Sequence, residues 1–305
     1  GARPDARGLT GAVSIIRTKT PAIVHGAVFE GVTIAALAGK VSGARTVIEE
    51  TSCPDRRSWR GDLLIHLYAR MADRLVAVSP AVTDYLRRRV HPPRRKLIEL
   101  INGIDTPLTP STSELERERE RLGLVGHSVV GSIGRVWDEV KRFSLLIRAL
   151  PDVLAQGHKV KLLLVGDGPD LERLRGLATE LGVGDSVVTP GYRRDVGTML
   201  GLMDVFALTS RTESFALVLV EAMLTGVPVV ATEVGGVPFV VGDAGVLLPA
   251  NVTAGALGQR LVQLLGSQST LAELGARGRT RATERFGSAR YVAETAAMYR
   301  ALLRG

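Results

Sequence analysis

Two glutamates, Glu213 and Glu221, stand in the otherwise apolar stretch TESFALVLVEAMLTGVPVVAT, which runs from Thr212 to Thr232. A carboxylate in apolar surroundings is unfavourable unless hydrogen-bond donors surround it. For Glu221, which stands between LVLV and AML, hydroxyl groups of a ligand could be those donors. The alternative is a structural role, in which Glu213 starts a helix and Glu221 is a surface or ion-paired carboxylate.

Two cations stand in a second stretch, GSIGRVWDEVKRF. Arg135 follows a predicted strand at its carboxyl end, and Lys141 begins the next predicted helix. Two cations beside a helix N-terminus suit a diphosphate, because they stabilise the negative charge that it gains as it departs. Taken alone, such a pair could equally be surface charge. A third turn, VGDGPD (residues 165–170), lacks the GxGxxG pattern of a dinucleotide-binding fingerprint.

The elements that must position these residues are short apolar strands that alternate with amphipathic helices. Such alternation predicts parallel sheets. Strands are expected at residues 22–26, 45–50, 73–79, 128–135, 160–168, 186–192, 204–210 and 227–234, and a strand that runs into a turn is expected at residues 96–105. Purely apolar segments such as KLLLVG and PVVAT indicate sheets covered on both faces. We therefore expect doubly wound sheets that bind ligands beyond the carboxyl ends of their strands.

The helix that carries Glu221 is expected to begin near Ser214. Glu213 would then reach the ligand from a loop. Glu221 would lie about two turns into the helix, on the face that also carries Leu217.

The length of 305 residues suits two domains. The segment TPLTPSTS, which follows Asp105, is typical of a linker. We expect an N-terminal domain over residues 1–105, a C-terminal domain over 106–280, and helices over 281–305 that pack back toward the first domain. The opening GARPDARGLTGAV is unlike a native start, and the first domain has few strands, so we expect that domain to be incomplete.

Composition narrows the function classes. The single cysteine, Cys53, cannot form an internal disulfide, which favours a reducing cytoplasm. No apolar run is long enough to predict a membrane span. The net charge of +8 indicates an anionic partner, such as a phosphorylated ligand or an acidic membrane surface. Nucleic acid is the weakest choice, because no RNA-binding aromatic pattern, zinc finger or helix-turn-helix is present.

Part of the positive charge lies in RRRVHPPRRK, residues 87–96. This run would suit an anionic membrane, or it could serve solubility alone.

Four segments together resemble the family 4 (GT4) retaining glycosyltransferases of the GT-B fold. They are GSIGRVWDEVKRFSLLIRAL, LLLVGDGPDLERLRGLATELGVGDSVVTPGYRRDV, TSRTESFALVLVEAMLTGVPVVATEVGGVP and the linker NGID. A glutamate, seven residues and a second glutamate are that family's hallmark. The resemblance implies an α/β protein with two doubly wound Rossmann-like domains that face each other across a cleft.

The resemblance also implies roles for the charged residues. Arg135 and Lys141 match the pair that grips the donor diphosphate. Glu213 matches the carboxylate near the hydroxyls of the donor sugar, and Glu221 matches the residue that binds the ribose. Glu213, Arg135 and Lys141 would be the catalytic residues.

Further contacts with the donor are implied around these residues. The backbone N–H groups of residues 215–217 would face the sugar and phosphate, and the two residues after TPG would hold the nucleobase. His25 matches the first histidine of a His-any-His segment, which would contact the sugar or acceptor. Beside the four charged residues, the implied donor-binding residues are Tyr192, Arg193, Ser214, Phe215, Ala216 and Leu217.

The chain departs from the family pattern at several positions. Ala27 replaces the second histidine, Phe239 stands where glutamate is usual, and Ala216 stands where glycine is usual. We also find no glycine-rich loop after a first strand. These departures bear on the identity of the sugar and on activity more than on donor binding. His25 alone could be a core histidine.

The implied reaction moves a sugar from a nucleoside diphosphate sugar to an acceptor hydroxyl with retention of anomeric configuration. UDP-sugars are the favoured donors and GDP-mannose is next. The acceptor could be a small molecule, a glycan or a lipid-linked molecule, with a peripheral contact at the inner face of an anionic membrane. No cofactor is expected, and no metal, because no Asp-any-Asp pair is present.

Three alternatives stay open from the sequence. The same fold could carry a nucleotide-sugar epimerase or a phosphorylase. It could also be a non-catalytic module that binds sugar nucleotides.

Overall fold

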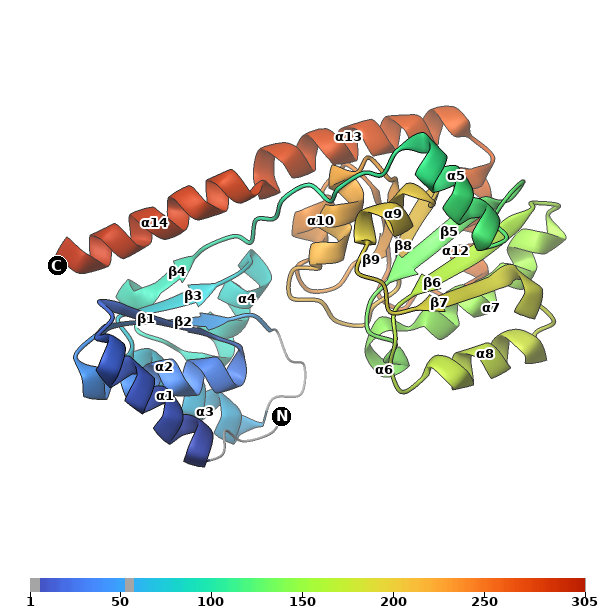
Figure 1. The fold of residues 1–305 in the computed structure, drawn as a ribbon. Coiled ribbons are helices and arrows are strands. Elements are labelled where there is room, and N and C mark those ends of the chain that lie inside the picture. The colour runs from blue at the N-terminus through green and yellow to red at the C-terminus, as the bar shows by residue number, and fades with distance from the viewer. Residues whose placement is uncertain (1–5, 53–57, 305) are drawn as a thin grey trace. The chain divides into compact units, whose positions relative to one another are not determined.

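The computed structural model describes residues 6–52 and 58–304, which form two compact units of parallel strands and helices (Figure 1). The first unit comprises Gly1–Gly103, Glu213–Phe215 and Ser288–Gly305, and the second comprises Ile104–Thr212 and Ala216–Gly287. Each unit contains one parallel sheet, which confirms the α/β architecture expected from the alternating strands and helices. Cys53, on which the expectation of a reducing compartment rested, lies outside the described residues.

The sheet of the first unit has the order β1-β2-β3-β4. Its strands are β1 (Ile23–Ala27), β2 (Arg45–Glu50), β3 (Arg74–Ala77) and β4 (Leu97–Glu99). All neighbours are parallel, with Ile48 paired to Leu75 and Leu75 paired to Leu97. The strands lie in chain order, so the reversal of a doubly wound sheet does not occur among the described strands of this unit. Each crossover moves the chain one strand further in the same direction.

Helices cover both faces of this sheet. Those of the first unit are α1 (Ala6–Lys19), α2 (Val28–Ser42), α3 (Trp59–Met71), α4 (Pro80–Tyr85), a π turn (Leu86–Val90), a 3-10 turn (Arg94–Lys96) and α14 (Ser288–Arg304). Helices α2 to α4 pack on the face that carries Ile48 and Leu75. Val47 and Val76 point to the opposite face, where they pack with Leu302 of α14.

Local chemistry explains where several of these helices begin and end. Ser79 caps α4, accepting a hydrogen bond from the N–H of Val82, and Pro80 occupies the first helical position, where proline is favoured. Gly43 ends α2 with φ 75°, a left-handed conformation that favours glycine.

The sheet of the second unit has the order β10-β9-β8-β5-β6-β7. Its strands are β5 (Ser128–Ile133), β6 (Val160–Val165), β7 (Val187–Gly191), β8 (Val205–Leu208), β9 (Val229–Thr232) and β10 (Val246–Leu248). The chain first moves outward from β5 to β7 and then returns to the other side of β5 with β8. This reversal confirms a doubly wound sheet and makes the gap between β5 and β8 a topological switch point.

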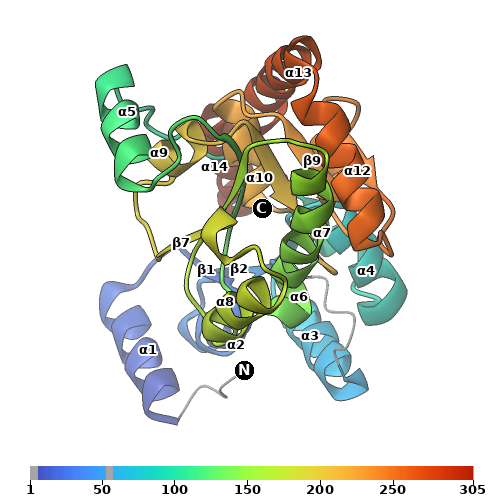
Figure 2. The same cartoon turned by 90° about the vertical axis from the view of Figure 1, so that its right-hand side faces the viewer.

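The helices of the second unit lie on both faces of its sheet (Figures 1 and 2). They are α5 (Thr112–Arg121), α6 (Asp138–Lys141), α7 (Phe143–Ala155), α8 (Leu171–Glu180), α9 (Val196–Gly201), α10 (Leu217–Leu224), α11 (Val237–Val241), α12 (Ala254–Leu265) and α13 (Gln268–Phe286), with a 3-10 turn at Gly184–Ser186. Helices α7, α8 and α12 share one core with β5 and β6, and α10 packs on α13 over β8 and β9.

Three helix boundaries differ from the sequence prediction. The linker segment ends in a helix, α5, whose N-cap Ser111 forms a capping box with Glu114. Pro169 in the segment PDLERLRGLATELG favours a helix that starts at this proline, but helix α8 begins two residues later, at Leu171. Helix α10 begins at Leu217 instead of near Ser214, because Ala216 has φ 68° and cannot continue a right-handed helix.

Among the described residues, no helix combines the length and the apolar character needed to cross a membrane.

Candidate functional site

The switch point of the second sheet gathers two loops that are distant in sequence. β5 pairs with β8 in parallel, so both strands end at the same edge of the sheet. Residues 134–142 follow β5 and carry Arg135 and Lys141. Residues 209–216 follow β8 and lead into α10. In open α/β sheets, ligands bind beyond the strand ends at such a reversal.

The loop that carries Arg135 is held by the glycine turn after β6. Gly134 N–H donates to the Val165 carbonyl at 3.0 Å, and Val136 N–H donates to the Asp167 carbonyl at 2.9 Å. A Cβ at Gly166 would lie less than 2 Å from the Gly134 carbonyl oxygen. The glycine turn VGDGPD therefore allows two backbones to approach closely, and it fixes the loop after β5.

A second clamp joins the loops after β5 and β8. The Thr209 hydroxyl lies 3.0 Å from each of the carbonyl oxygens of Lys141 and Arg142. The Arg142 Nε donates to the Thr209 carbonyl at 2.6 Å, and Arg211 N–H donates to the Val140 carbonyl at 2.8 Å. The backbone of Lys141 is thereby fixed beside the end of β8.

Within this frame, the side chains of both cations lie at the loop after β5. The Lys141 Cε lies 3.5 Å from the position of a Cβ on Gly134, so its stem crosses the residue that precedes Arg135. Arg135 is exposed, and its guanidinium lies 5.9 Å from the centre of the Trp137 ring. Among the described residues, no ion pair occupies the Arg135 guanidinium. It is accessible to an anionic ligand.

Arg142 is a structural residue of this site that sequence reasoning did not identify. It has φ 49°, a strained conformation for a side chain of its size. Its Nη1 donates to the Ala250 carbonyl at 2.9 Å, whereas its buried Nη2 has no partner among the described residues. Burial, with Arg211 nearby, lowers the pKa of Arg142. Adjacency to Lys141 was the only sequence signal for this residue.

Glu221 is a half-buried carboxylate on α10. It lies four residues after the first residue of the helix, so it is just over one turn in and not two; Leu217 still shares its face. Burial raises the pKa of Glu221. Within the described part of the chain, no hydrogen bond or ion pair reaches the carboxylate. It can therefore accept hydrogen bonds from the hydroxyls of a ligand.

The residues between the β8 loop and α10 include the first of the two glutamates. Glu213, Ser214 and Phe215 group with the first unit and directly precede Ala216, the N-cap of α10. Glu213 and Ser214 are half-buried, and Phe215 is buried. Ala216 occupies a left-handed conformation that costs an L-residue about 1 kcal/mol. This conformation explains why glycine would be the usual residue there.

The two residues after β7 differ in their surroundings. Tyr192 is 70% exposed. The Arg193 guanidinium lies 2.6 Å from Asp195 and 3.0 Å from Glu118 on α5, and pairing raises its pKa. The Arg193 side chain is therefore engaged in holding α5 to the loop after β7.

His25 belongs to a polar cluster of the first unit. Its Nδ1 lies 2.6 Å from the hydroxyl of Tyr299 on α14. Its Nε2 lies 3.3 Å from Glu49 Oε2 without hydrogen-bond geometry. Burial raises the pKa of Tyr299, and Tyr291 and Glu49 nearby raise it further. These contacts give His25 a structural role within this unit.

Two departures from the family pattern have visible surroundings. Phe239 packs edge-on against Phe286 with ring centres 5.9 Å apart, and Arg285 lies 5.2 Å from its ring centre. An apolar contact thus occupies the position where glutamate is usual. Ala27 is exposed, and it precedes Val28, which has φ 59°, an outlier for a β-branched residue.

No cluster of three or more histidine, cysteine, aspartate or glutamate residues in the described ranges could hold a metal ion.

Residues 127–267 match the family model described as "Glycosyl transferases group 1". The chain is 31% identical over 249 residues to N-acetyl-α-D-glucosaminyl L-malate synthase of Bacillus anthracis, covering 79% of this chain and 63% of that protein. It is 37% identical over 175 residues to the GDP-mannose-dependent α-(1-6)-phosphatidylinositol monomannoside mannosyltransferase of Mycolicibacterium smegmatis, covering 53% of this chain and 46% of that protein. The chain thus spans less than two thirds of these relatives.

Solved structures show the same fold. HepE from Anabaena, crystallised with UDP and glucose, superposes with a TM-score of 0.86 and 24% identity, covering 96% of this chain and 81% of that chain. Sucrose-phosphate synthase from Thermosynechococcus elongatus superposes with a TM-score of 0.81 and 22% identity, covering 98% of this chain and 79% of that chain. The GT-B fold expected from the sequence is confirmed by these likenesses.

Proposed function

Since this chain belongs to the family 4 glycosyltransferases of the GT-B fold, we propose that it transfers a sugar from a nucleoside diphosphate sugar to an acceptor hydroxyl. The observation that carries this proposal is the Glu221 carboxylate, half-buried without a partner among the described residues. It lies on the helix that follows the switch-point loop. Such a carboxylate binds a pentose, because two ribose hydroxyls can donate to its oxygens.

The diphosphate binds at Arg135 and Lys141 in this proposal. The transition state is oxocarbenium-like, and negative charge grows on the departing diphosphate. Cations held by the two loop clamps stabilise that charge where it develops and need no reorganisation during the reaction. They take the place of a metal ion.

Retention follows from front-face attack in this proposal. The acceptor hydroxyl attacks the anomeric carbon from the side that the diphosphate leaves, and a donor phosphate oxygen takes its proton. A double displacement would need a carboxylate nucleophile within bonding reach of that carbon. Glu213, which we place near the sugar hydroxyls, is the only candidate for that second route.

We propose UDP-sugars as donors, with GDP-mannose next. The Anabaena structure contains UDP and glucose, whereas the Mycolicibacterium relative is named as GDP-mannose-dependent. Since Tyr192 is exposed and the Arg193 side chain is paired with acids, we assign base recognition mainly to the backbone of this loop. His25 remains a secondary candidate for contact with the sugar or acceptor.

The acceptor is proposed as a small polyol or hydroxy acid, or a lipid-linked equivalent. The names of the relatives include malate, inositol 3-phosphate and phosphatidylinositol monomannoside. A lipid-linked acceptor would bring the protein to the inner face of a membrane.

Ligand-dependent thermal stabilisation tests the donor site. A nucleoside diphosphate at a hundredfold excess over its Kd should stabilise the native state by about 2.7 kcal/mol. We expect UDP to stabilise most, GDP next and ADP least. Stabilisation by none of the three would overturn the proposal.

Turnover then separates the competing activities. Incubation with UDP-glucose or GDP-mannose, with and without malate and inositol phosphate, should release UDP or GDP only when an acceptor is present. NMR of the product's anomeric proton reports retention. Release of nucleotide without an acceptor would indicate an epimerase, and a dependence on inorganic phosphate would indicate a phosphorylase. Binding without any turnover would indicate a non-catalytic module.

A further inference from the structure

Helix α3 of the first unit exposes an apolar stripe. Trp59, Leu63 and Leu67 are 68%, 49% and 47% exposed. Their spacing of four residues places them within an arc of about 80° on the helix. The opposite face of α3 is anchored by buried residues such as Ile65 and Ala69. Three large apolar side chains aligned in water mark an interaction surface.

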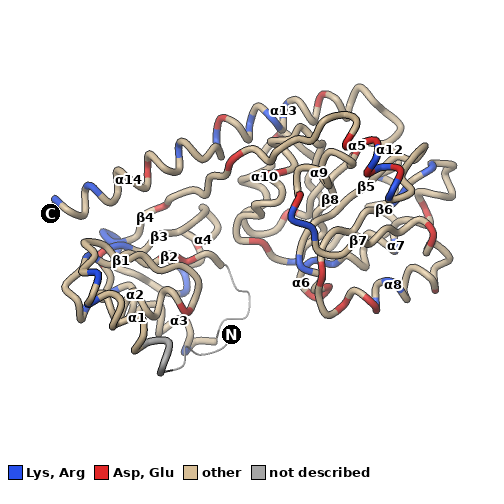
Figure 3. Tube along the Cα trace, viewed as in Figure 1, with Lys and Arg blue, Asp and Glu red and all other residues tan. Residues whose placement is uncertain are grey.

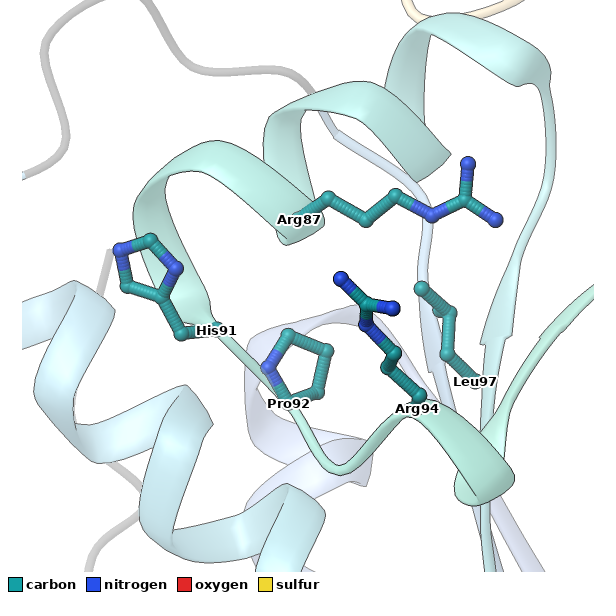
Figure 4. Close-up of a pocket in the computed structure, with 5 residues that line it drawn as sticks. All are labelled: Arg87, His91, Pro92, Arg94 and Leu97. Carbon is teal, nitrogen blue, oxygen red and sulfur yellow. The ribbon is translucent and has the colours of Figure 1, made fainter.

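A basic segment, Leu86–Lys96, lies next to this stripe; Figure 3 marks its arginines and lysine in blue. Arg87 and Arg94 line one pocket with His91, Pro92 and Leu97, and the Arg94 side chain extends toward that of Arg87 (Figure 4). Among the described residues, neither guanidinium forms an ion pair. No described residue of the unit therefore neutralises their positive charge.

Two further arginines of the segment, Arg88 and Arg89, have acidic partners. The Arg89 Nη2 lies 3.0 Å from Asp62 of α3, and Arg88 lies 3.8 Å from Asp84. Arg89 thus ties the segment to α3, while Arg87 and Arg94 remain available to an external anion.

The stripe and the basic segment form one continuous surface. Both elements contribute to a second pocket, lined by Trp59, Asp62, Leu63, His66, Arg88, Arg89, Val90 and His91. His91 also borders the pocket of Arg87 and Arg94. Asp62 accepts from the Tyr85 hydroxyl at 2.6 Å, and His66 Nδ1 lies 2.8 Å from the Val90 carbonyl. These bonds hold the apolar and cationic parts in a fixed arrangement.

This surface is separate from the sheet edge at which substrates bind. Leu97, the first residue of β4, lines the pocket, so the pocket lies at the amino end of that strand. Ligands of parallel α/β sheets bind at the opposite edge, beyond the carboxyl ends.

We propose that this surface docks the protein on an anionic phospholipid bilayer. Trp59, Leu63 and Leu67 enter the interface between headgroups and acyl chains, where tryptophan is favoured. Arg87 and Arg94 bind lipid phosphates, for which a guanidinium fork is suited. The apolar stripe favours a bilayer over a nucleic acid, because a phosphate backbone has no apolar surface on which the two leucines could pack. The proposal does not rest on the glycosyl transfer reaction.

Flotation with vesicles tests the docking. Phosphatidylcholine vesicles that contain phosphatidylglycerol should bind the protein, and pure phosphatidylcholine vesicles should bind it much less. Each arginine near an anionic surface contributes to binding, so Arg87→Ala with Arg94→Ala should weaken binding about thirtyfold. The matched control is Arg148→Ala with Arg260→Ala, which removes two exposed arginines of the second unit and should leave binding nearly unchanged. Equal losses in both double variants would overturn the proposal.

Fluorescence tests insertion. The chain has two tryptophans, so Trp137→Phe leaves Trp59 as the only reporter. Its emission should shift to the blue, and acrylamide should quench it less, when the anionic vesicles are added. Unchanged emission on bound vesicles would exclude insertion and overturn the proposal. So would heparin binding that matches vesicle binding, because that result would indicate a general polyanion surface.

Discussion

The Asp62 carboxylate of the first unit and the Glu221 carboxylate of the second have different surroundings. In the first unit, buried Asp62 accepts from the Tyr85 hydroxyl and pairs with Arg89, and buried Glu49 lies beside His25. In the second unit, the half-buried Glu221 has no such partner among the described residues, and burial raises its pKa. A satisfied carboxylate stabilises its unit. An unsatisfied carboxylate persists where function needs it, at a cost in stability.

The sheets of the two units also differ, in the order of their strands. The first has its described strands in chain order, whereas the second reverses between β5 and β8. The reversal brings together two loops that are distant in sequence, those that contain Lys141 and Thr209. This difference supports our proposal that the donor binds to the second unit, and substitutions in either unit can test it.

The largest effect is expected from Lys141→Ala. Loss of one preorganised contact with a developing charge should lower turnover by about a hundredfold to a thousandfold. Release of the nucleoside diphosphate from the donor in the presence of acceptor measures this turnover. Lys161→Ala is the matched control, because its ammonium donates to the Asp185 carbonyl, remote from the switch point, and to no other group in the described residues. Similar losses of turnover in both variants would contradict the proposed contact between Lys141 and the donor diphosphate.

The next largest effect concerns the glycine turn that holds the Arg135 loop. Gly166→Ala would place a Cβ on the Gly134 carbonyl at φ 141°, which should destabilise the fold by about 3 kcal/mol or more. Gly176→Ala in α8 meets nothing within 4 Å, so it should stabilise by up to about 1 kcal/mol. Urea denaturation of both variants measures the difference. If Gly166→Ala were as stable as the parent, that result would contradict the close approach of the glycine turn to the Gly134 carbonyl.

Local sequence signals predicted much of the fold. The apolar strands, the Ser79 cap and the turn at Gly43 all follow from nearby residues. Helix α5 was not predicted, because the proline, serine and threonine residues of TPLTPSTS are typical of a linker. Ser111, which belongs to this segment, is the N-cap of α5. The start of α10 was misplaced because the left-handed conformation of Ala216 is imposed by its surroundings. The helix propensities of nearby residues cannot predict a backbone conformation that the surrounding structure imposes.

The candidate site was predictable only in part. Arg135, Lys141 and Glu221 stand at recognisable strand ends and helix starts, and their roles stay predictions. The hydrogen bonds that hold the loops of these residues in place could not be predicted from the sequence, because those between Arg142 and Thr209 join positions 67 residues apart. Whether a carboxylate has a partner is likewise a property of tertiary structure.

The smallest effect, and the most direct test of the comparison, pairs Glu221→Gln with Asp62→Asn. Glu221→Gln should weaken UDP binding about tenfold, measured by calorimetry, because the ribose loses a charged acceptor. It should also stabilise the free protein at neutral pH. Asp62→Asn should destabilise by about 1 to 3 kcal/mol, since Arg89 loses its partner.

The pH dependence separates these two effects. Because burial raises the pKa of Glu221 in the folded state, the unfolded chain loses that proton first as pH rises from about 4.3. The stability that depends on this group is complete below that pH and is lost as pH rises through the folded pKa. The advantage of Glu221→Gln should therefore be absent in acid and grow toward neutrality. If urea denaturation showed the same advantage at every pH, or a loss at neutral pH, Glu221 would have a partner in the fold and its role as a ligand acceptor would be wrong.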